Sequence, residues 1–410
     1  MPSASNNPAV RPRASVRRRF AVAGLLLCIS AIGALIVGEV ILRLVPIPGI
    51  SYHSFYYDSM TGGKYVPNTI LMYRSQRGER TQRRANGWGF PDHGHDLRPA
   101  PGTLRIGFFG DSYAEALQVP LENTFFRVIE DELNRRACEL HRPVNRRGEA
   151  VRRFETLSFG ISGRGTLQSY LECRQWMAAS DLDYVVYVFV ENDPGDQIPS
   201  VRPTDIAPYP VLSADTFVVD RSFHDRYGYK DKWPHRILQY IKANSLVVST
   251  IEGRLKLLMT YGIQRSLTEA ERTGAVGAAG RPGMAPSSWH SDSLVTAAWE
   301  LEERVLGRWA RDVAAENRRF LVYRVPREEV LLEPLDGQDS WAPRLHEFCG
   351  RAGIPLIDPT PYLAERARAG HEVYYDHFTS EGHRAFAESF VSFLLAAECG
   401  RHREDVEDSR

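Results

Sequence analysis

The chain has 410 residues, enough for one large or two ordinary domains, and its 43% hydrophobic and 10% aromatic content is typical of a globular protein. Lysine plus arginine and aspartate plus glutamate both number 51, so no global charge favours nucleic acid or an acidic polymer as a partner. The five cysteines form no Cys-x-x-Cys pair, which disfavours a structural zinc site, and we expect neither a metal nor a cofactor.

The N-terminus predicts a membrane anchor. Residues 1–19 carry five arginines and no acid, and residues 20–38 then run without a charge. A run of this length nearly matches the roughly 20 residues that cross a bilayer, so we expect a basic cytoplasmic segment over 1–19 and a transmembrane helix over 20–45. The positive-inside rule then places the rest of the chain in the periplasm or outside the cell. The alternative is a cleaved signal peptide, which the length of the apolar run disfavours.

Strand-like and helix-like segments alternate from residue 102 onward. Apolar runs predict the strands, and apolar residues at spacings of three and four predict the helices. The alternation predicts an α/β domain over 102–399 with a parallel sheet covered by helices on both faces. The strands are expected at 104–110, 154–160, 183–190, 319–326 and 354–359, and the helices at 123–138, 166–179, 293–317, 342–352 and 380–399.

Three other segments differ in composition from this domain. Residues 46–101 are rich in Gly, Pro, Tyr and Arg and predict an irregular or short-stranded lead-in. An insertion at about 197–292 contains the candidate strand "TFVVD" and the helix-like "RILQYIKANSLVVSTIEGRLKLL", and it is a candidate lid over a site. The charged tail over 400–410 predicts disorder.

The first and last helices of the domain suggest a disulfide. Helices 123–138 and 380–399 are expected to share one face of the sheet and to run the same way. Because Cys138 and Cys399 lie at their carboxyl ends, a bond between these two is a hypothesis, with unpaired buried thiols as the alternative.

Polar or glycine-rich residues follow several of the predicted strands. Ser112 follows the first strand through a glycine turn, and at that edge of a sheet a serine is either a helix cap or a nucleophile. The glycines of "SFGISGRG" (158–165) do not have the order of a nucleotide-binding turn, but their N–H groups suit an oxyanion. Asn192 follows the third strand, where it forms an Asx turn or donates to a developing negative charge. His377 precedes the last helix and is a candidate base for a serine.

These blocks together resemble a known family, the SGNH or GDSL-like hydrolases. "GDS" (110–112), "GISG" (160–163), "ND" (192–193) and "DHFTSEGH" (376–383) occur in the family's order, and "NGWGFPDH" in the lead-in is similar to membrane-anchored bacterial members. The resemblance covers roughly residues 80–395. It implies a flavodoxin-like three-layer sandwich with a central parallel sheet. It also implies these roles: Ser112 as nucleophile, its own N–H with the Gly163 N–H and the Asn192 side chain as oxyanion donors, and His377 as base.

The residue that orients His377 departs from the family pattern. The family places an aspartate two or three residues before the histidine, whereas here positions 374 and 375 are tyrosines and Asp376 is adjacent to His377. Neighbouring side chains on an extended strand point to opposite faces, so Asp376 reaches the ring only if the backbone turns there. The alternatives are Asp358, Glu372, a backbone carbonyl or a Ser-His dyad, and His383 is the second candidate base.

The combined prediction is a membrane-anchored, extracytoplasmic serine acyl hydrolase, an esterase or deacetylase. Its substrate would be an acylated carbohydrate or another ester, and its N-terminal helix would contact the lipid bilayer. Transfer of the acyl group to a sugar hydroxyl would instead make it an O-acyltransferase that modifies a cell-surface or secreted polysaccharide. A catalytically inactive, membrane-tethered carbohydrate-binding protein is the alternative from another class, favoured by the displaced Asp376 and disfavoured by the set Ser112, Gly163, Asn192 and His377.

Overall fold

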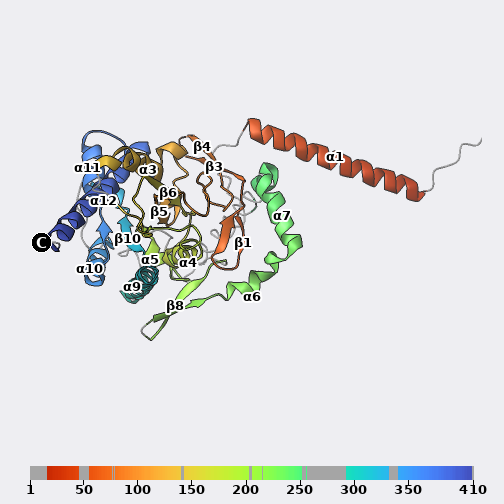
Figure 1. The fold of residues 1–410 in the computed structure, drawn as a ribbon. Helices are drawn as coiled ribbons and strands as arrows, with labels where there is room; N and C mark the ends of the chain where they lie inside the picture. Colours follow the sequence, from red (N-terminus) through yellow and green to blue (C-terminus); the bar gives the residue numbers. More distant parts are fainter. Residues whose placement is uncertain are drawn as a thin grey trace, which may run out of the picture.

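The centre of the protein is a five-stranded parallel sheet (Figure 1). The computed structural model describes residues 16–45, 55–75, 77, 79–139, 143–202, 206–214, 216–251, 255, 292–331 and 340–408, with the backbone alone at 16–17, 138, 292 and 398–408. The strands are β5 (Thr103–Phe109), β6 (Arg153–Ser158), β7 (Tyr184–Phe189), β10 (Arg319–Arg324) and β11 (Leu356–Ile357).

The strand order across the sheet is β6-β5-β7-β10-β11. Counted along the chain this order is 2-1-3-4-5, which is the flavodoxin-like arrangement of a doubly wound sheet. The predicted fold class is therefore confirmed. In such a sheet, ligands bind beyond the carboxyl ends of the strands where the order reverses, which here is between β5 and β7.

The central strands β5 and β7 are rich in apolar residues, as strands that are buried on both faces must be. Every residue of β5 and of β7 is buried, because helices cover both faces of the sheet. The expected strand over 354–359 is shorter, since only two residues of β11 pair with β10. Prolines on both sides of these two residues remove the amide hydrogens that would extend the ladder.

One helical layer covers the face of the sheet that carries Ile106 and Phe108. It consists of α3 (Phe125–Arg135), α11 (Thr360–Arg368) and α12 (Ser380–Asp408). The expectation that the first and last helices share a face is confirmed, because α3 packs directly on α12. The backbone of α12 remains helical through residues 400–408, where we expected disorder. Charge excludes these residues from a core, but adding residues to an existing helix needs no new nucleus.

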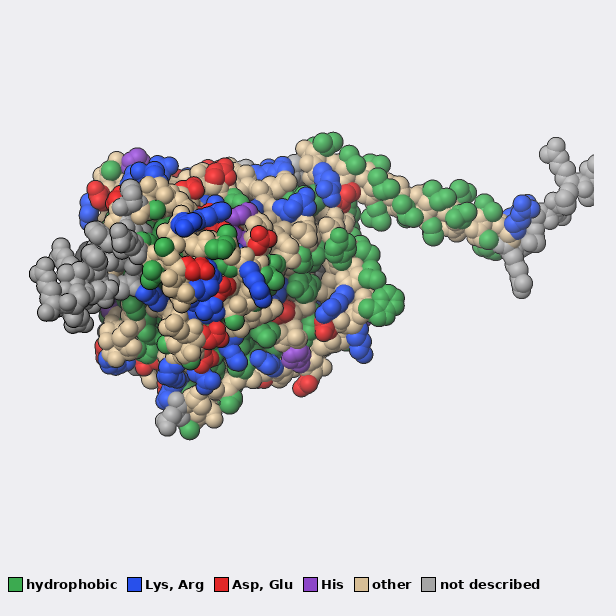
Figure 2. Space-filling view, viewed as in Figure 1, with side chains coloured by type: hydrophobic (Ala, Val, Ile, Leu, Met, Phe, Trp, Pro, Cys, Tyr) green, Lys and Arg blue, Asp and Glu red, His purple; other side chains and the backbone are tan. Residues whose placement is uncertain are grey.

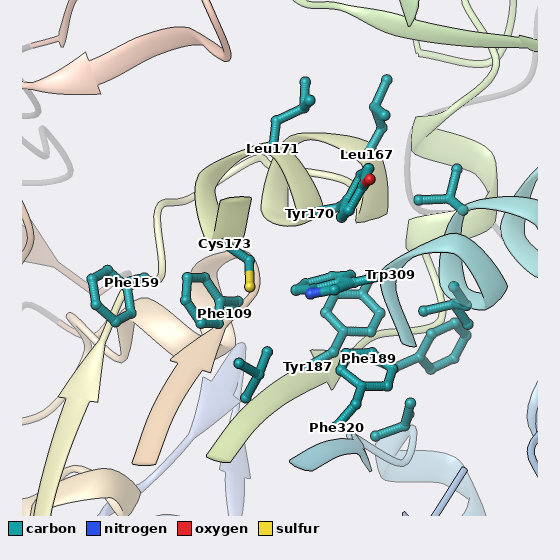
Figure 3. Packing of buried hydrophobic residues seen from close by; sticks show 14 of the residues in the cluster. Phe109, Phe159, Leu167, Tyr170, Leu171, Cys173, Tyr187, Phe189, Trp309 and Phe320 are labelled. Atoms are coloured by element: carbon teal, nitrogen blue, oxygen red, sulfur yellow. The ribbon is translucent and has the colours of Figure 1, made fainter. Parts of the chain in front are cut away.

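The other layer covers the opposite face and consists of α4 (Thr166–Trp176), α9 (Asp292–Ala315) and α10 (Ala342–Ala352). Figure 3 shows Trp309 of α9 lying over Tyr187 of β7, with ring centroids 5.0 Å apart. Phe109 and Phe159, at the ends of β5 and β6, stack at 4.6 Å in the same cluster. These aromatic contacts hold the carboxyl ends of the strands together.

The lead-in and the insertion add short elements around this sandwich. The lead-in forms two hairpins, and the described part of the insertion packs on α9 and β1, while residues 252–254 and 256–291 of the candidate lid lie outside the described residues. The elements are β1 (Phe55–Asp58), β2 (Gly62–Tyr65), β3 (Ile70–Arg74) and β4 (Arg80–Arg84), then β8 (Tyr209–Ser213), β9 (Thr216–Asp220), α6 (Phe223–Tyr227) and α7 (Trp233–Asn244). The candidate strand "TFVVD" coincides with β9.

The N-terminal helix α1 (Val16–Leu44) extends away from the sandwich (Figure 1). Its segment Arg18–Leu44 is long and apolar enough to span a membrane, with a mean hydropathy of 2.7 and no part of the apolar window buried. The apolar helix that we expected over 20–45 is therefore present. The proposed Cys138–Cys399 bond involves side chains outside the described part of the structure, so it stays a prediction.

Candidate active site

Ser112 lies at the carboxyl end of β5, where the sheet order reverses. It is the first residue of the short helix α2 (Ser112–Glu115). The preceding Asp111 caps this helix, because its carboxylate accepts a hydrogen bond of 2.9 Å from the Tyr113 N–H. Asp111 therefore takes the capping role that Ser112 was a candidate for. The Ser112 hydroxyl instead faces a second segment of the chain.

That second segment carries His377. The Nε2 atom of His377 lies 2.7 Å from the Ser112 Oγ, which is hydrogen-bond distance. The ring of Tyr113 packs on the imidazole, with centroids 4.7 Å apart. The fold thus brings a serine and a histidine that are separated by 265 positions in the sequence within hydrogen-bond distance, which is the contact that a serine nucleophile and its base require.

Asp376 reaches His377 because the backbone turns between them. The strands β12 (Tyr374–Tyr375) and β13 (His377–Phe378) form a hairpin in which Tyr375 pairs with His377, so Asp376 is the single residue of the turn. Its φ of 65° lies in the left-handed region, which aspartate tolerates better than most residues. The turn brings the Asp376 Oδ2 to 3.3 Å from the His377 Nδ1, and this hydrogen bond lowers the pKa of the Asp376 carboxyl.

The alternative carboxylates have other partners. Both oxygens of Asp358 accept hydrogen bonds of 3.0 Å from Arg324, and Glu372 pairs with Arg77 at 2.9 Å. The lead-in also supplies a residue that we did not predict, since the Tyr73 hydroxyl of β3 donates to the Asp376 Oδ2 at 3.1 Å. No local pattern marked Tyr73, because it is 303 positions from its partner.

The second candidate base, His383, is a core residue of α12. Its side chain is buried, and its Nδ1 accepts a hydrogen bond of 3.3 Å from the Phe125 N–H. Burial lowers the pKa of His383 to about 3, so the ring is neutral at ordinary pH. It ties α12 to α3.

Asn192 and Gly163 both lie beside one ion pair. Asn192 follows β7, and its Nδ2 donates to the Asp196 Oδ2 at 2.8 Å. Arg202 pairs with the same carboxylate. Gly163 has a φ of 79°, and a Cβ atom added to it would lie only 2.8 Å from the Arg202 Nη2. A residue with a side chain would therefore be strained there and would displace the guanidinium.

This ion pair is close enough to Asp111 to act on its charge. Burial raises the pKa of the Asp111 carboxyl to about 6, the charge of Asp196 adds to that rise, and the charge of Arg202 opposes it. The ion pair beside Asn192 and Gly163 thus acts electrostatically on the aspartate that precedes Ser112. Arg202 was not predicted, because it lies in the insertion, outside the four blocks.

Glu115 connects α2 to the glycine-rich segment over residues 158–165, called the glycine loop below. It is fully buried, and it accepts hydrogen bonds from the Tyr65 hydroxyl of β2 and from the Ser162 N–H, the latter at 3.0 Å. A Cβ atom added to Gly160 would lie 2.2 Å from the Glu115 N, so the loop touches the backbone of α2. The only sequence signal for Glu115 was its place on the turn after Ser112.

The other polar residues of the third block support the structure. Asp193 accepts hydrogen bonds from the Tyr187 hydroxyl at 2.6 Å and from the Val190 N–H at 2.7 Å, and burial raises its pKa. Glu191 binds the N-terminal end of α10 through Ser340 and the Trp341 N–H. Glu191, the residue before Asn192, therefore contributes to packing.

One group of side chains in the described part of the chain has the composition of a metal site. Ligand atoms of Asp92, His93 and His95 lie within 4.8 Å of one another. The two Asp92 oxygens already accept hydrogen bonds from both histidine rings, and Oδ2 also accepts one of 3.0 Å from the Ser158 N–H at the end of β6. The group thus fastens the lead-in to the sheet.

Comparisons with known proteins give matches in structure. No family model matches the chain, and no curated relative matches it. Similar solved structures include an acetyl xylan esterase, a lipase/acylhydrolase from Enterococcus faecalis and a G-D-S-L family lipolytic protein from Desulfitobacterium hafniense. In that order they are 12%, 9% and 8% identical to this chain, with TM-scores of 0.35, 0.34 and 0.34. The matches cover 71%, 72% and 70% of this chain, and 100%, 96% and 98% of the other chains.

Proposed function

We propose that this protein is a serine acyl hydrolase in which Ser112 is the nucleophile and His377 is the general base. The observation that carries the proposal is the 2.7 Å distance between the Ser112 Oγ and the His377 Nε2. A serine hydroxyl is a weak nucleophile until a base accepts its proton. A proton on the His377 Nδ1 faces Asp376, which leaves the lone pair of Nε2 directed at Ser112.

The reaction follows from this geometry. The Ser112 oxygen attacks the ester carbonyl carbon while its proton moves to the His377 Nε2, and the carbonyl electrons move onto the oxygen. Collapse of this tetrahedral adduct breaks the bond to the alcohol, which leaves with the proton from Nε2. Water then gives a proton to Nε2 as its oxygen attacks the acyl carbon. Collapse of this second adduct breaks the bond to the Ser112 oxygen, which takes the proton back from Nε2, and the carboxylic acid is released.

We assign the oxyanion to the segments that follow β5, β6 and β7. The donors in this proposal are the N–H groups of Ser112 and Gly163 and the second amide hydrogen of Asn192, whose first hydrogen bonds Asp196. The Asp196 contact supports the role because it holds the amide in one orientation. Arg202, next to Gly163, pairs with the same Asp196 carboxylate and so holds this partner of Asn192 in place.

The proposed location is extracytoplasmic, with α1 as an uncleaved anchor. The arginines before the apolar segment support this orientation by the positive-inside rule. The substrate class is an ester, and acylated carbohydrates are one source of it.

The test is ester turnover by the full chain in detergent. We expect p-nitrophenyl acetate hydrolysis by the wild type and a loss of at least about a thousandfold in kcat for Ser112→Ala and for His377→Ala. A fluorophosphonate should label the wild type and leave Ser112→Ala unlabelled, whereas Ser213→Ala, at an exposed serine of β8, serves as the control and keeps both properties.

Two results would separate the alternatives. Labelling that persists in Ser112→Ala, or equal turnover in all variants, contradicts the proposal and favours a binding protein. Labelling at Ser112 without hydrolysis keeps the nucleophile but excludes water as the acceptor, which favours an acyltransferase.

A further inference from the structure

The helix α7 presents its apolar side chains to solvent. Trp233, Ile237, Tyr240 and Ile241 recur at the spacing of one helical face, and they are 73%, 50%, 59% and 52% exposed. No residue of α7 is buried. Figure 2 shows hydrophobic side chains gathered over this segment, on the side toward which α1 extends. A contiguous exposed apolar surface of this kind is typical of an interaction site.

The opposite face of α7 is the one that contacts the protein. His235, Gln239 and Lys242 lie two positions further along and are partly buried. Gln239 accepts a hydrogen bond of 2.8 Å from the Tyr57 N–H of β1 and donates one of 3.1 Å to the Lys230 carbonyl. The helix is therefore held to the domain by its polar face, and this attachment directs its apolar face toward solvent.

The end of α7 is joined to the base of α1. Glu39 of α1 accepts hydrogen bonds from the Ser245 hydroxyl and the Leu246 N–H, both at 3.1 Å, and from the Val247 N–H at 3.2 Å. Arg43 donates to the Asn244 carbonyl at 3.3 Å. The segment 244–247 thus lies against the last turns of the candidate membrane span.

The remaining length of α1 matches a bilayer. From Arg19 to Gly38, just before the Glu39 contact, a helix rises by roughly 30 Å, which is the thickness of the hydrocarbon core. When this part of α1 spans the membrane, the chain at Glu39 emerges at the membrane surface. The end of α7 lies at that level, and Figure 1 shows α7 running across the direction of α1.

We propose that α7 is an interfacial helix whose apolar face lies in the outer boundary of the lipid bilayer, so that the domain is held against the membrane at two places. Tryptophan and tyrosine at Trp233 and Tyr240 have the chemistry of the lipid-water boundary. A cavity of about 390 Å³ between the base of α1, the β3–β4 hairpin and the end of α7 is lined by Arg43, Arg80 and Arg84, whose guanidinium groups suit lipid phosphates.

The test uses the full chain in phosphatidylcholine and phosphatidylglycerol vesicles, with and without lipid brominated near the headgroup. The emission of Trp233 is obtained as the difference between the wild type and Trp233→Phe. We expect brominated lipid to reduce this difference about twofold and aqueous iodide to leave it unchanged. The control is Val218→Trp on β9, which is 53% exposed in the same insertion and should show the opposite pattern.

A second variant separates the role of α7 from that of α1. Ile237→Lys with Ile241→Lys should stay bound to vesicles through α1 and keep its p-nitrophenyl acetate activity, but lose the quenching of Trp233 by brominated lipid. Quenching of the wild-type Trp233 emission by iodide, with no quenching by brominated lipid, would overturn the proposal. Protection from both quenchers that rises with protein concentration would overturn it as well, because a second copy of the chain would then cover the face.

Discussion

The loops around Ser112 and the insertion around α7 differ in which kind of side chain they bury. Around Ser112, a buried carboxylate such as Glu115 has partners from two other segments, and the glycine loop has no room for one more carbon atom. Around α7, large apolar side chains face solvent and the polar face contacts the domain. In the first region polar side chains are removed from water and paired with one another. In the second, we infer, apolar side chains are exposed so that they contact lipid.

The largest effect is expected where the packing is tightest. Gly160→Ala places a carbon atom 2.2 Å from the Glu115 N, so the glycine loop and α2 must separate. We expect a loss of about 3 kcal/mol in the free energy of unfolding, measured by denaturant titration in detergent, and a loss of ester turnover. Gly94→Ala is the control, because nothing lies within 4 Å of its added carbon. Equal stability of the two variants would contradict the tight contact.

Next in size is the contribution of the turn aspartate. Asp376→Asn keeps the shape but removes the charge that faces the His377 Nδ1, so we expect kcat/KM to fall by roughly tenfold to a hundredfold. The loss stays below that of Ser112→Ala because Asp376 is partly exposed. Glu372→Gln, two residues before this hairpin, should stay within about twofold of the wild type. An unchanged Asp376→Asn would leave a Ser-His dyad as the mechanism.

The pH dependence of stability should show that His383 is a neutral residue of the core and not part of the active site. Its pKa is about 3 in the folded protein and near 6.5 when unfolded, so between these values the unfolded chain binds the proton and the folded protein does not. Stability therefore falls as pH falls from about 6.5 to 3, and this group contributes about 1.4 kcal/mol per pH unit.

The measurement is the free energy of unfolding of the wild type and His383→Gln across that range. The glutamine oxygen can accept the Phe125 N–H, so the variant should fold, show a shallower slope and keep its esterase activity. Parallel slopes would mean that His383 is not held neutral. Loss of activity without loss of stability would make His383 part of the site.

The smallest effect is expected on α7. Ile237→Ala removes exposed apolar atoms in detergent solution, so the free energy of unfolding should change by less than about 0.5 kcal/mol. The matched control is Ile129→Ala in the fully buried part of α3, which should cost about 2–5 kcal/mol. A large cost at Ile237 would show that this face is packed against protein, and the contrast between the two regions would fail.

Periodicity and residue order predicted a parallel sheet covered by helices on both faces, and the resemblance of the four blocks predicted the site residues. Mostly apolar runs that alternate with amphipathic helices predict strands covered on both faces, and chain order then predicts a sheet whose carboxyl edge carries Ser112 and Asn192. The roles proposed for Ser112 and His377 rest on their chemistry and on the resemblance of the four blocks. Such local patterns are visible in a sequence because each depends on residues a few positions apart.

Only the tertiary structure decided which groups meet across the chain. The left-handed turn at Asp376 brings its carboxylate to His377, although adjacent residues on a strand would point apart. Tyr73 and Glu115 obtain their partners from segments 47 or more positions away, and no local pattern encodes such contacts. The periodicity of α7 predicts an apolar face but not its direction, because that direction depends on Tyr57 binding Gln239 and on Glu39 binding the segment that follows α7.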